Sequence, residues 1–245
     1  MLSSLKDYGD QLLQDIAAEN NLSETAFLYL NEEKSEEQNS IRLRWFTPKA
    51  EVNLCGHATL ASAFIYFSEI QPTQHQVIFN TRSGNLTCHK LENKISIRLP
   101  KDEIISLPMR AEHISLTNIP PIEVYQGKED LMLVFSSEEE VQKAIPNLRL
   151  IEKIGYRGLI ITAKGNNVDV VSRFFTPQLG IDEDPVTGSA HTTLAAYWVK
   201  KISKIQLHCK QLSRRGGTIE CYIKEEEIEL IGEAKCYMSG RIYTP

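Results

Sequence analysis

Apolar and polar residues alternate along most of this chain with the period of two that β-strands show. An amphipathic helix is expected over residues 8–20 and a strand at the apolar run 25–30, and alternating runs then predict strands at 41–46, 76–80, 84–89 and 94–99. The second half repeats this plan, with a short helix at 138–144 and strands at 131–135, 158–163, 168–175, 205–208, 217–222, 228–232 and 234–237. Many short strands with few helices indicate an α+β fold.

Two segments break the alternation, because small and apolar residues cover nearly every side of them. They are residues 57–69, HATLASAFIYFSE, and residues 190–201, AHTTLAAYWVKK. A helix that is apolar all round is normally buried on all sides. We therefore expect one buried helix in each half of the chain.

Similar sequences precede the two expected helices. Arg44-Trp-Phe-Thr-Pro48 leads through a loop to Gly56-His57-Ala58, and Arg173-Phe-Phe-Thr-Pro177 leads through a longer loop to Gly188-Ser189-Ala190. Internal repeats usually mark duplicated structural units. We therefore expect two pseudo-symmetric halves, each a curled, mostly antiparallel, barrel-like sheet around a central helix.

The division between these halves is expected near the turn at Pro120-Pro121, which follows a polar stretch. We place the first half at residues 1–112 and the second half at residues 113–245. The last strand of the chain is a candidate to pack back on the first half.

Each glycine turn opens a helix, and this position favours binding of an anion. The first turn of a helix leaves backbone N–H groups unpaired and carries the positive end of the helix dipole. Glycine lets a ligand approach that backbone closely. Two such ends across a cleft would hold an anionic group such as a carboxylate. The alternative is that Gly56 and Gly188 only begin buried helices.

Side chains that can catalyse reactions or bind ligands lie at the same turns. Cys55 and His57 flank Gly56, while Asp184 and Ser189 precede the second helix. Histidine at a helix N-terminus is expected to be a neutral donor, because the dipole disfavours its charge. Asp184 and Ser189 are equally suited to cap a helix. Glu24 lies between a helix end and a strand, and the pattern does not distinguish a catalytic carboxylate from an exposed one.

Composition narrows the function classes. The chain has 245 residues, 42% of them hydrophobic, and a formal net charge of -5, which argues against disorder and against general affinity for nucleic acid or anionic membranes. No apolar run reaches the ~18 residues of a membrane-spanning helix. Five scattered cysteines without a CxxC pair argue against a disulfide framework or a structural zinc site. With no visible signal peptide, a reducing cytoplasm is expected.

Three segments together resemble one known family. They are IAAENNLSETAF (16–27), FTPKAEVNLCGHATLASAF (46–64) and GIDEDPVTGSAHTTLAAYW (180–198). In these segments the chain is similar to the phenazine biosynthesis PhzF-like family, which shares the diaminopimelate epimerase fold. The resemblance runs over most of the chain. It implies an active site in the cleft between two halves, and assembly as a homodimer.

The resemblance also implies roles for particular residues. In the phenazine enzyme of that family, a glutamate moves a proton along a dihydro-hydroxyanthranilate skeleton, without metal or cofactor. Glu24 matches that glutamate, and His57 and Asp184 match its catalytic partners. The residues that match substrate-binding positions are Ser23, Gly56, Gly188 and Ser189. We therefore expect a small-molecule carboxylate substrate, no cofactor and no metal.

The family pattern is incomplete at the start of the chain. Members normally begin with a strand bearing Asp-Ala-Phe and a Gly-Asn-Pro turn, and this chain starts after both. The first half is therefore expected to lack the family's N-terminal strand.

The favoured mechanism is cofactor-independent proton transfer by Glu24, with a pKa raised toward neutrality by burial in the cleft. One alternative is a two-base racemase or epimerase that uses Cys55 as a thiolate favoured by the helix end. The matching stretch 184–190 contains no cysteine that would form a symmetrical pair. The other alternative is a catalytically idle relative that binds a small molecule.

Overall fold

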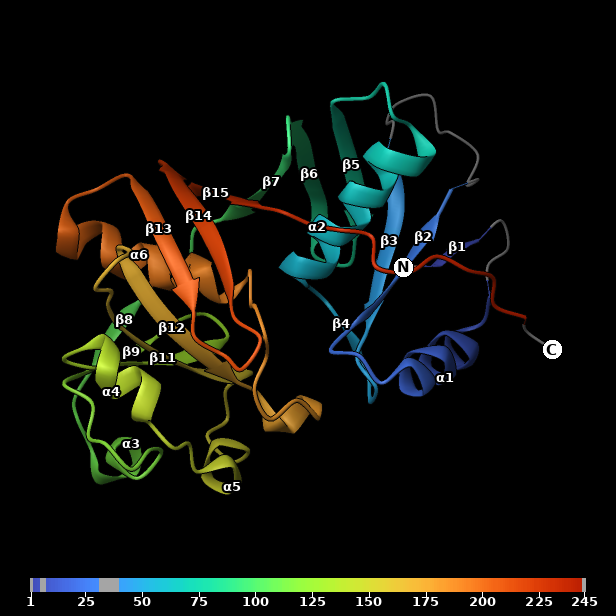
Figure 1. The fold of residues 1–245 in the computed structure, drawn as a ribbon. Coiled ribbons are helices and arrows are strands. Elements are labelled where there is room, and N and C mark those ends of the chain that lie inside the picture. Colours follow the sequence, from blue (N-terminus) through green and yellow to red (C-terminus); the bar gives the residue numbers. More distant parts are fainter. Residues whose placement is uncertain (1, 5–7, 31–39, 244–245) are drawn as a thin grey trace.

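The computed structural model describes residues 2–4, 8–30 and 40–243, and its fold is drawn in Figure 1. The strands of the described chain form one continuous fifteen-stranded sheet that runs through two groups of elements. The first group contains β1 (Leu2–Ser4), α1 (Asp10–Asn20), β2 (Thr25–Tyr29), β3 (Ser40–Phe46), β4 (Glu51–Val52), α2 (Gly56–Ile65), the π-helical turn η1 (Tyr66–Ile70), β5 (Gln76–Thr81), β6 (Gly84–Leu91) and β7 (Lys94–Pro100).

The second group follows along the chain and carries two extra strands at its outer edge. It contains β8 (Ile105–Leu107), α3 (Ala111–Ile114), β9 (Glu123–Gln126), β10 (Asp130–Val134), α4 (Glu138–Lys143), α5 (Leu148–Ile151), β11 (Gly158–Lys164), β12 (Val170–Phe175), the 3-10 turn η2 (Pro177–Leu179), α6 (Ala190–Ile202), β13 (Gln206–Gln211), β14 (Gly217–Lys224) and β15 (Glu227–Gly232). Among the described residues, no helix is long and apolar enough to span a bilayer.

The two groups have the same strand pairing. Along β1, β2, β3, β5, β6 and β7, the successive pairs are parallel, antiparallel, parallel, antiparallel and antiparallel. The series β10, β11, β12, β13, β14 and β15 repeats that order. The helices α2 and α6 occupy equivalent places in the two series. The predicted α+β fold of two pseudo-symmetric curled sheets is therefore confirmed.

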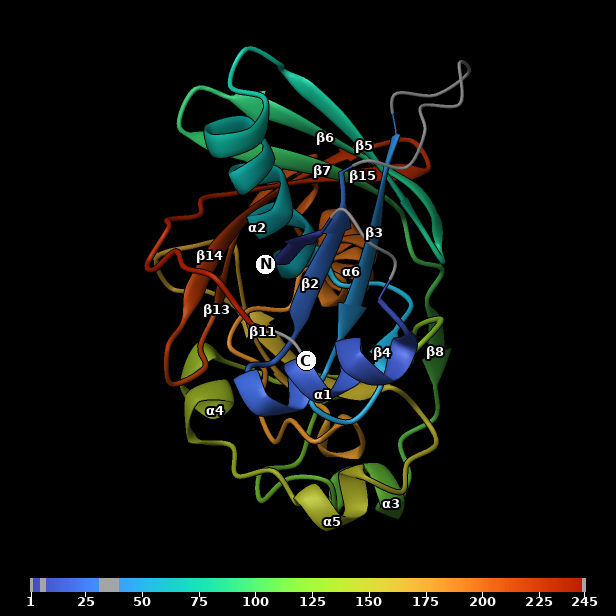
Figure 2. The same cartoon turned by 90° about the vertical axis from the view of Figure 1, so that its right-hand side faces the viewer.

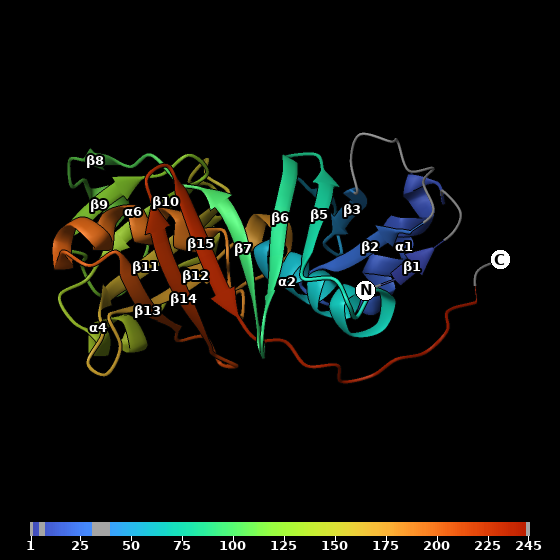
Figure 3. The ribbon, with the colours of Figure 1, turned by 90° about the horizontal axis from the view of Figure 1, so that it is seen from above.

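The halves are joined through their sheets and through one core. β7 pairs antiparallel with β15, and Figure 3 shows these two strands side by side at the junction. The largest apolar cluster includes Ala63 of α2 and Leu194 of α6 together with residues of both sheets. Along the chain, strand pairing passes from the first group to the second between Pro100 and Ile105, because β8 already pairs with β9 of the second group. The boundary after residue 112 stays a prediction.

Burial of the two central helices follows their composition. Eight residues of α6 are buried, from Ala190 to Trp198, which confirms the buried helix predicted there. In α2, five residues are buried but Ala61 is exposed, so this helix keeps one open side. A third, smaller apolar cluster packs α1 through Leu13 and Ala17 against β2 and β3, and Figure 2 shows α1 across these strands.

One predicted strand is wrong. Residues 234–237 form no strand, and Tyr237 is 98% exposed. Alternating side chains specify a strand only where a neighbouring strand supplies backbone partners, and the segment after β15 has none among the described residues. In Figure 3 this segment belongs to the red trace that leaves β15.

Candidate active site

Gly56 and Gly188 bring the starts of α2 and α6 into direct contact. A Cβ atom on Gly56 would lie 3.0 Å from Cα of Gly188, and one on Gly188 would lie 3.1 Å from Cα of Gly56. Neither glycine has a positive φ angle. Glycine is therefore required here by the close approach of two backbones.

Two helix dipoles converge at this contact with the same sign. The first N–H groups of each helix have no carbonyl partner within it and carry partial positive charge. Neither Cys55 nor Ser189, the residues at the two N-cap positions, makes a side-chain capping hydrogen bond. The capping interpretation of Ser189 is therefore wrong, and Asp184 lies too early in the chain to cap α6. The juxtaposed helix starts favour an anion in the space beside them.

A cavity of about 570 Å³ lies at this contact. Six of the seven predicted site residues line it: Glu24, Gly56, His57, Asp184, Gly188 and Ser189. The seventh, Ser23, has its hydroxyl oxygen 3.3 Å from Nε2 of His57. The tertiary structure thus brings together residues from positions 23 to 189 of the chain, although the role of each stays a prediction.

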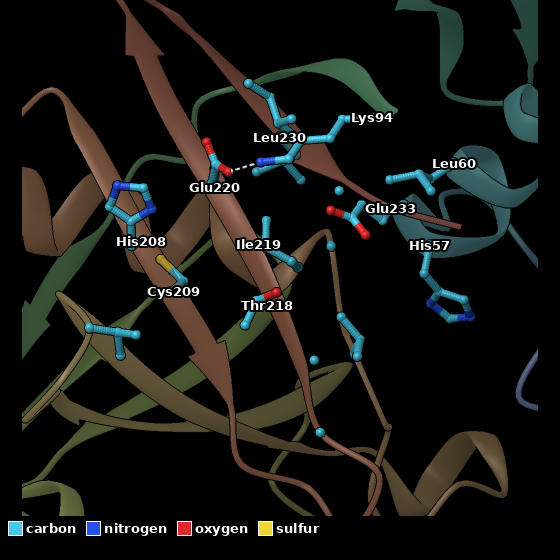
Figure 4. A pocket seen from close by; sticks show the side chains of 18 of the residues that line it. His57, Leu60, Lys94, His208, Cys209, Thr218, Ile219, Glu220, Leu230 and Glu233 are labelled. Atoms are coloured by element: carbon cyan, nitrogen blue, oxygen red, sulfur yellow. Dashed lines mark hydrogen bonds and ion pairs between the residues drawn. The ribbon is translucent and has the colours of Figure 1, made fainter. Parts of the chain in front are cut away.

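A larger cavity, of about 1130 Å³, shares Gly56, His57 and Gly188 with the first. It extends between α2 and the strands β13 to β15, and Figure 4 shows His57 at its margin and the Lys94–Glu220 ion pair across it. Glu24, Asp184 and Ser189 do not line this larger cavity. The candidate chemistry therefore lies in the smaller one.

Glu24 and His57 form an ion pair in the smaller cavity. Oε2 of Glu24 lies 2.9 Å from Nε2 of His57, and the carboxylate side chain is only 12% exposed. Burial alone raises the pKa of Glu24, but His57, with hydrogen bonds from Ser23 and Cys55, outweighs burial and lowers the pKa below its ordinary 4.5. The predicted upward shift is wrong, because the neighbouring cation was not visible in the sequence.

The contact with Glu24 also determines the protonation state of His57. Burial opposes a charged ring, but the neighbouring Cys55 sulfur and the Glu24 carboxylate raise the pKa of His57 well above 6.5. Because Cys55 is a thiol at neutral pH, Glu24 is the anion that holds the imidazolium. The expectation of a neutral His57 is therefore wrong, since contact with a carboxylate outweighs the helix dipole.

Cys55 does not have the thiolate expected at a helix end. It is buried, and burial raises its pKa to about 11 despite the opposing effect of His57. Its sulfur lies 3.8 Å from Nδ1 and 3.9 Å from Nε2 of His57. Desolvation in the packed core therefore outweighs both the helix dipole and the neighbouring His57 cation, each of which favours a thiolate.

Asp184 is the second carboxyl group of the cavity. It is 4% exposed; its Oδ2 accepts a short hydrogen bond from the Thr187 hydroxyl, while its Oδ1 is buried without a partner. Burial raises its pKa, the charge of His57 lowers it and that of Glu24 raises it, with a net upward shift. A buried oxygen without a partner is costly and favours a polar ligand group beside it.

Arg157 is a cavity residue that sequence reasoning missed. Its Nη1 donates to Oγ of Ser189 at 2.8 Å, and its Nε donates to Oδ1 of Asp130 at 2.9 Å. Asp130 begins β10 and is 2% exposed. Because Ser189 accepts from Arg157, its own hydroxyl hydrogen is free to be donated elsewhere. An isolated Tyr-Arg-Gly sequence before a strand gave no signal of this network.

The repeated Arg-aromatic-Phe-Thr-Pro sequence has the same contacts in both halves. Arg44 donates two hydrogen bonds to Glu51 at 2.8 and 2.7 Å and lies 5.0 Å from the Phe46 ring centre. Arg173 donates two to Glu183 at 2.7 and 3.1 Å and lies 4.9 Å from the Phe175 ring centre. Each arginine therefore stabilises the loop that leads to the glycine turn of its own half.

Comparison with known families agrees with this geometry. Residues 2–240 match the PhzC-PhzF family, described as phenazine biosynthesis-like protein. The chain belongs to this family. It is 39% identical over 233 residues to an uncharacterized isomerase from Pseudomonas aeruginosa, covering 95% of this chain and 87% of that protein.

Solved structures give the same assignment. A phenazine biosynthesis protein of the PhzF family from Enterococcus faecalis has a TM-score of 0.91 and 38% identity, covering 99% of this chain and 91% of that one. A predicted epimerase from Pseudomonas aeruginosa has a TM-score of 0.72 and 18% identity, covering 97% of this chain and 92% of that one, and shows the fold alone. Membership in the phenazine biosynthesis-like family therefore supports an isomerase-type enzyme.

Proposed function

We propose that this protein is a cofactor-independent isomerase that moves a proton on a small carboxylated substrate. The observation that carries the proposal is that the carboxylate of Glu24, 12% exposed, lies in the same cavity as two converging helix N-termini. The helix starts supply an anion-binding site, and Glu24 supplies a base. A cavity of about 570 Å³ suits a molecule of metabolite size.

Substrate binding uses the backbone at the two glycines. The substrate carboxylate accepts hydrogen bonds from N–H groups at Gly56 and Gly188, and from the hydroxyl of Ser189 that Arg157 orients. Ser23 contributes a further hydroxyl beside His57. Binding at this point would neutralise the like-signed ends of α2 and α6.

Proton transfer starts from the ionised form of Glu24. The lowered pKa keeps the carboxylate unprotonated at neutral pH, which is the form that accepts a proton from carbon. Glu24 then returns the proton to another carbon on the same face of the substrate. His57, as an imidazolium, and Asp184, with its free Oδ1, interact with polar substituents of the substrate.

The internal symmetry favours this reaction over a two-thiol racemase. Because Gly56 and Gly188 meet, Cys55 and Thr187 occupy equivalent positions before them. A thiol pair needs a second cysteine, and threonine stands there. The buried, protonated Cys55 gives the same preference.

A catalytically idle binding relative is the remaining alternative. Homodimeric assembly and a cytoplasmic location stay predictions.

Solvent deuterium exchange tests the proposal. Wild-type protein and Glu24→Gln are incubated in D₂O with a panel of small unsaturated and hydroxylated carboxylic acids, and deuterium incorporation into carbon is followed by mass spectrometry. We expect incorporation with wild type and at least a ~100-fold lower rate with Glu24→Gln. Glu19→Gln, which changes an exposed glutamate of α1, is the matched control.

Two outcomes contradict the proposal. An equal exchange rate in Glu24→Gln removes Glu24 as the base. Tight binding of a carboxylate without any exchange in wild type favours the idle relative. Thermal melting and circular dichroism of both variants check that they are folded.

A further inference from the structure

Three side chains with different donor atoms meet at the base of the cavity. The carboxylate of Glu24, the thiol of Cys55 and the imidazole of His57 offer ligand atoms that all lie within 4.8 Å of one another. Glu24 stands directly before β2, while Cys55 and His57 flank Gly56 at the start of α2. The cluster is therefore fixed to two structural elements whose backbones are packed in the core.

The spacing fits three corners of a tetrahedral metal site. Zinc bonds of roughly 2.0–2.3 Å place neighbouring tetrahedral ligand atoms roughly 3.3–3.6 Å apart. Here Nε2 of His57 lies 2.9 Å from Oε2 of Glu24 and 3.9 Å from Sγ of Cys55. Side-chain movements of about an ångström would convert this triangle into the face of such a tetrahedron.

The donor atoms are available to a cation. Oε2 of Glu24 is buried and accepts no aligned hydrogen bond, although it lies close to His57. The sulfur of Cys55 forms no disulfide. All three residues line the cavity, so the fourth position of the tetrahedron faces space that holds water or substrate. Three protein ligands with one open position is an arrangement that zinc accepts.

We propose that Glu24, Cys55 and His57 form a binding site for a thiophilic divalent cation of the zinc class. The thiolate and imidazole ligands select Zn²⁺, Co²⁺ or Cd²⁺ over Mg²⁺ and Ca²⁺, which prefer oxygen ligands. On binding, the Cys55 thiol and the His57 imidazolium each release one proton to solvent, and the Glu24 carboxylate completes the set.

The functional consequence is reversible inhibition, and this part rests on the proposed function. A cation held by Glu24 and His57 occupies the base and its partner, so proton transfer cannot occur. Binding of the cation itself does not depend on the isomerase reaction. Failure of metal binding and failure of the isomerase proposal are therefore separate results.

Cobalt spectroscopy tests the site directly. The full-length protein, treated with chelator and kept reduced and anaerobic, is titrated with CoCl₂. We expect one equivalent to bind, with a near-ultraviolet thiolate-to-cobalt charge-transfer band and intense visible bands of tetrahedral cobalt. One equivalent of ZnCl₂ should abolish both. Replacing an inner ligand in Cys55→Ala should weaken binding by more than the roughly 10–100-fold that loss of an outer partner costs.

Matched variants keep the test decisive. Cys209→Ser removes one thiol of a separate sulfur pair, Cys209 and Cys221, whose sulfur atoms lie 3.8 Å apart, and should keep the band. Glu24→Gln should retain the thiolate band at a weaker affinity, because sulfur and nitrogen remain. Absence of one-equivalent binding in folded wild type, or an unchanged band in Cys55→Ala, overturns the proposal. Loss of the band in Cys209→Ser does so as well, because it assigns the metal to the other pair.

Discussion

Gly56 and Gly188 touch backbone to backbone, and this contact makes one site out of two half-molecules. Gly56 begins α2 and Gly188 stands two residues before α6, and each would carry a Cβ atom within 3.1 Å of the other's Cα. The pseudo-twofold relation of the sheets therefore converges on these two residues. The anion-binding capacity of the cavity depends on that convergence, since a single helix start would supply half of the N–H groups.

Alanine at either glycine should separate the helix starts. We expect Gly188→Ala and Gly56→Ala to lower the free energy of unfolding by about 1–3 kcal/mol, because the new methyl group meets backbone that cannot move aside. Urea denaturation measures this. Gly9→Ala is the control, since a Cβ there meets nothing within 4 Å. Equal stability of Gly188→Ala and wild type would show that the helices separate without cost.

The Glu24–His57 pair should stabilise the fold within a defined pH window. Glu24, with a lowered pKa, contributes fully above 4.5 and loses its contribution as the pH falls through its folded pKa. His57, with a raised pKa, contributes fully below 6.5 and loses its contribution as the pH rises through its folded pKa. We expect the stability difference between wild type and Glu24→Gln to be largest between pH 4.5 and 6.5.

Urea unfolding of both proteins from pH 4 to pH 9 checks this window. Nuclear magnetic resonance of the His57 ring adds an independent measurement, because Glu24→Gln should lower the pKa of His57. A ring that titrates at the same pH in both proteins would show that Glu24 does not hold the imidazolium.

Arg157 should be required for the stability of the fold, because it neutralises the buried carboxylate of Asp130. In Arg157→Met, the Asp130 carboxylate, 2% exposed, loses its cation, and removal of one partner of a buried pair costs roughly 3–5 kcal/mol. The double variant Asp130→Asn with Arg157→Met should be less destabilised than Arg157→Met, because the unpaired charge is gone. Chemical denaturation of the single and double variants gives the comparison, and additive losses would argue against the pair.

The thiol of Cys55 should react slowly with alkylating reagents. Its burial and its pKa of about 11 leave almost no thiolate at pH 8, whereas Cys236 is exposed. We expect iodoacetamide to label Cys236 first and Cys55 only after denaturation, as followed by peptide mass spectrometry. Rapid labelling of Cys55 in the folded protein, accompanied by loss of deuterium exchange, would favour the racemase alternative.

The local pattern of apolar and polar residues was sufficient to predict most helices and strands. It was insufficient where pairing with a neighbouring strand decides whether a strand forms. The strands β5 and β6 follow the alternation that a half-buried sheet requires, whereas β2 is a short apolar run that is buried at every position. Residues 234–237 show the same alternation and remain unpaired. The short strands β8 and β9 carried too few alternating residues to stand out. They exist because β10 offers an edge to β9, and β9 in turn offers one to β8.

The sequence by itself determined the α+β class, the two buried helices and the repeated Arg-to-glycine segments, while its resemblance to the phenazine biosynthesis-like family named the seven residues of the candidate site. These features depend on local periodicity and on motifs that are contiguous in the chain. Only the tertiary structure decided the charges, because a pKa depends on neighbours in space. Glu24 is ionised because His57 lies 2.9 Å away, and Cys55 is a thiol because the packed core excludes water from it. The Arg157–Asp130 network depended on the fold for the same reason, since its members meet only when β10, the start of β11 and the start of α6 are assembled.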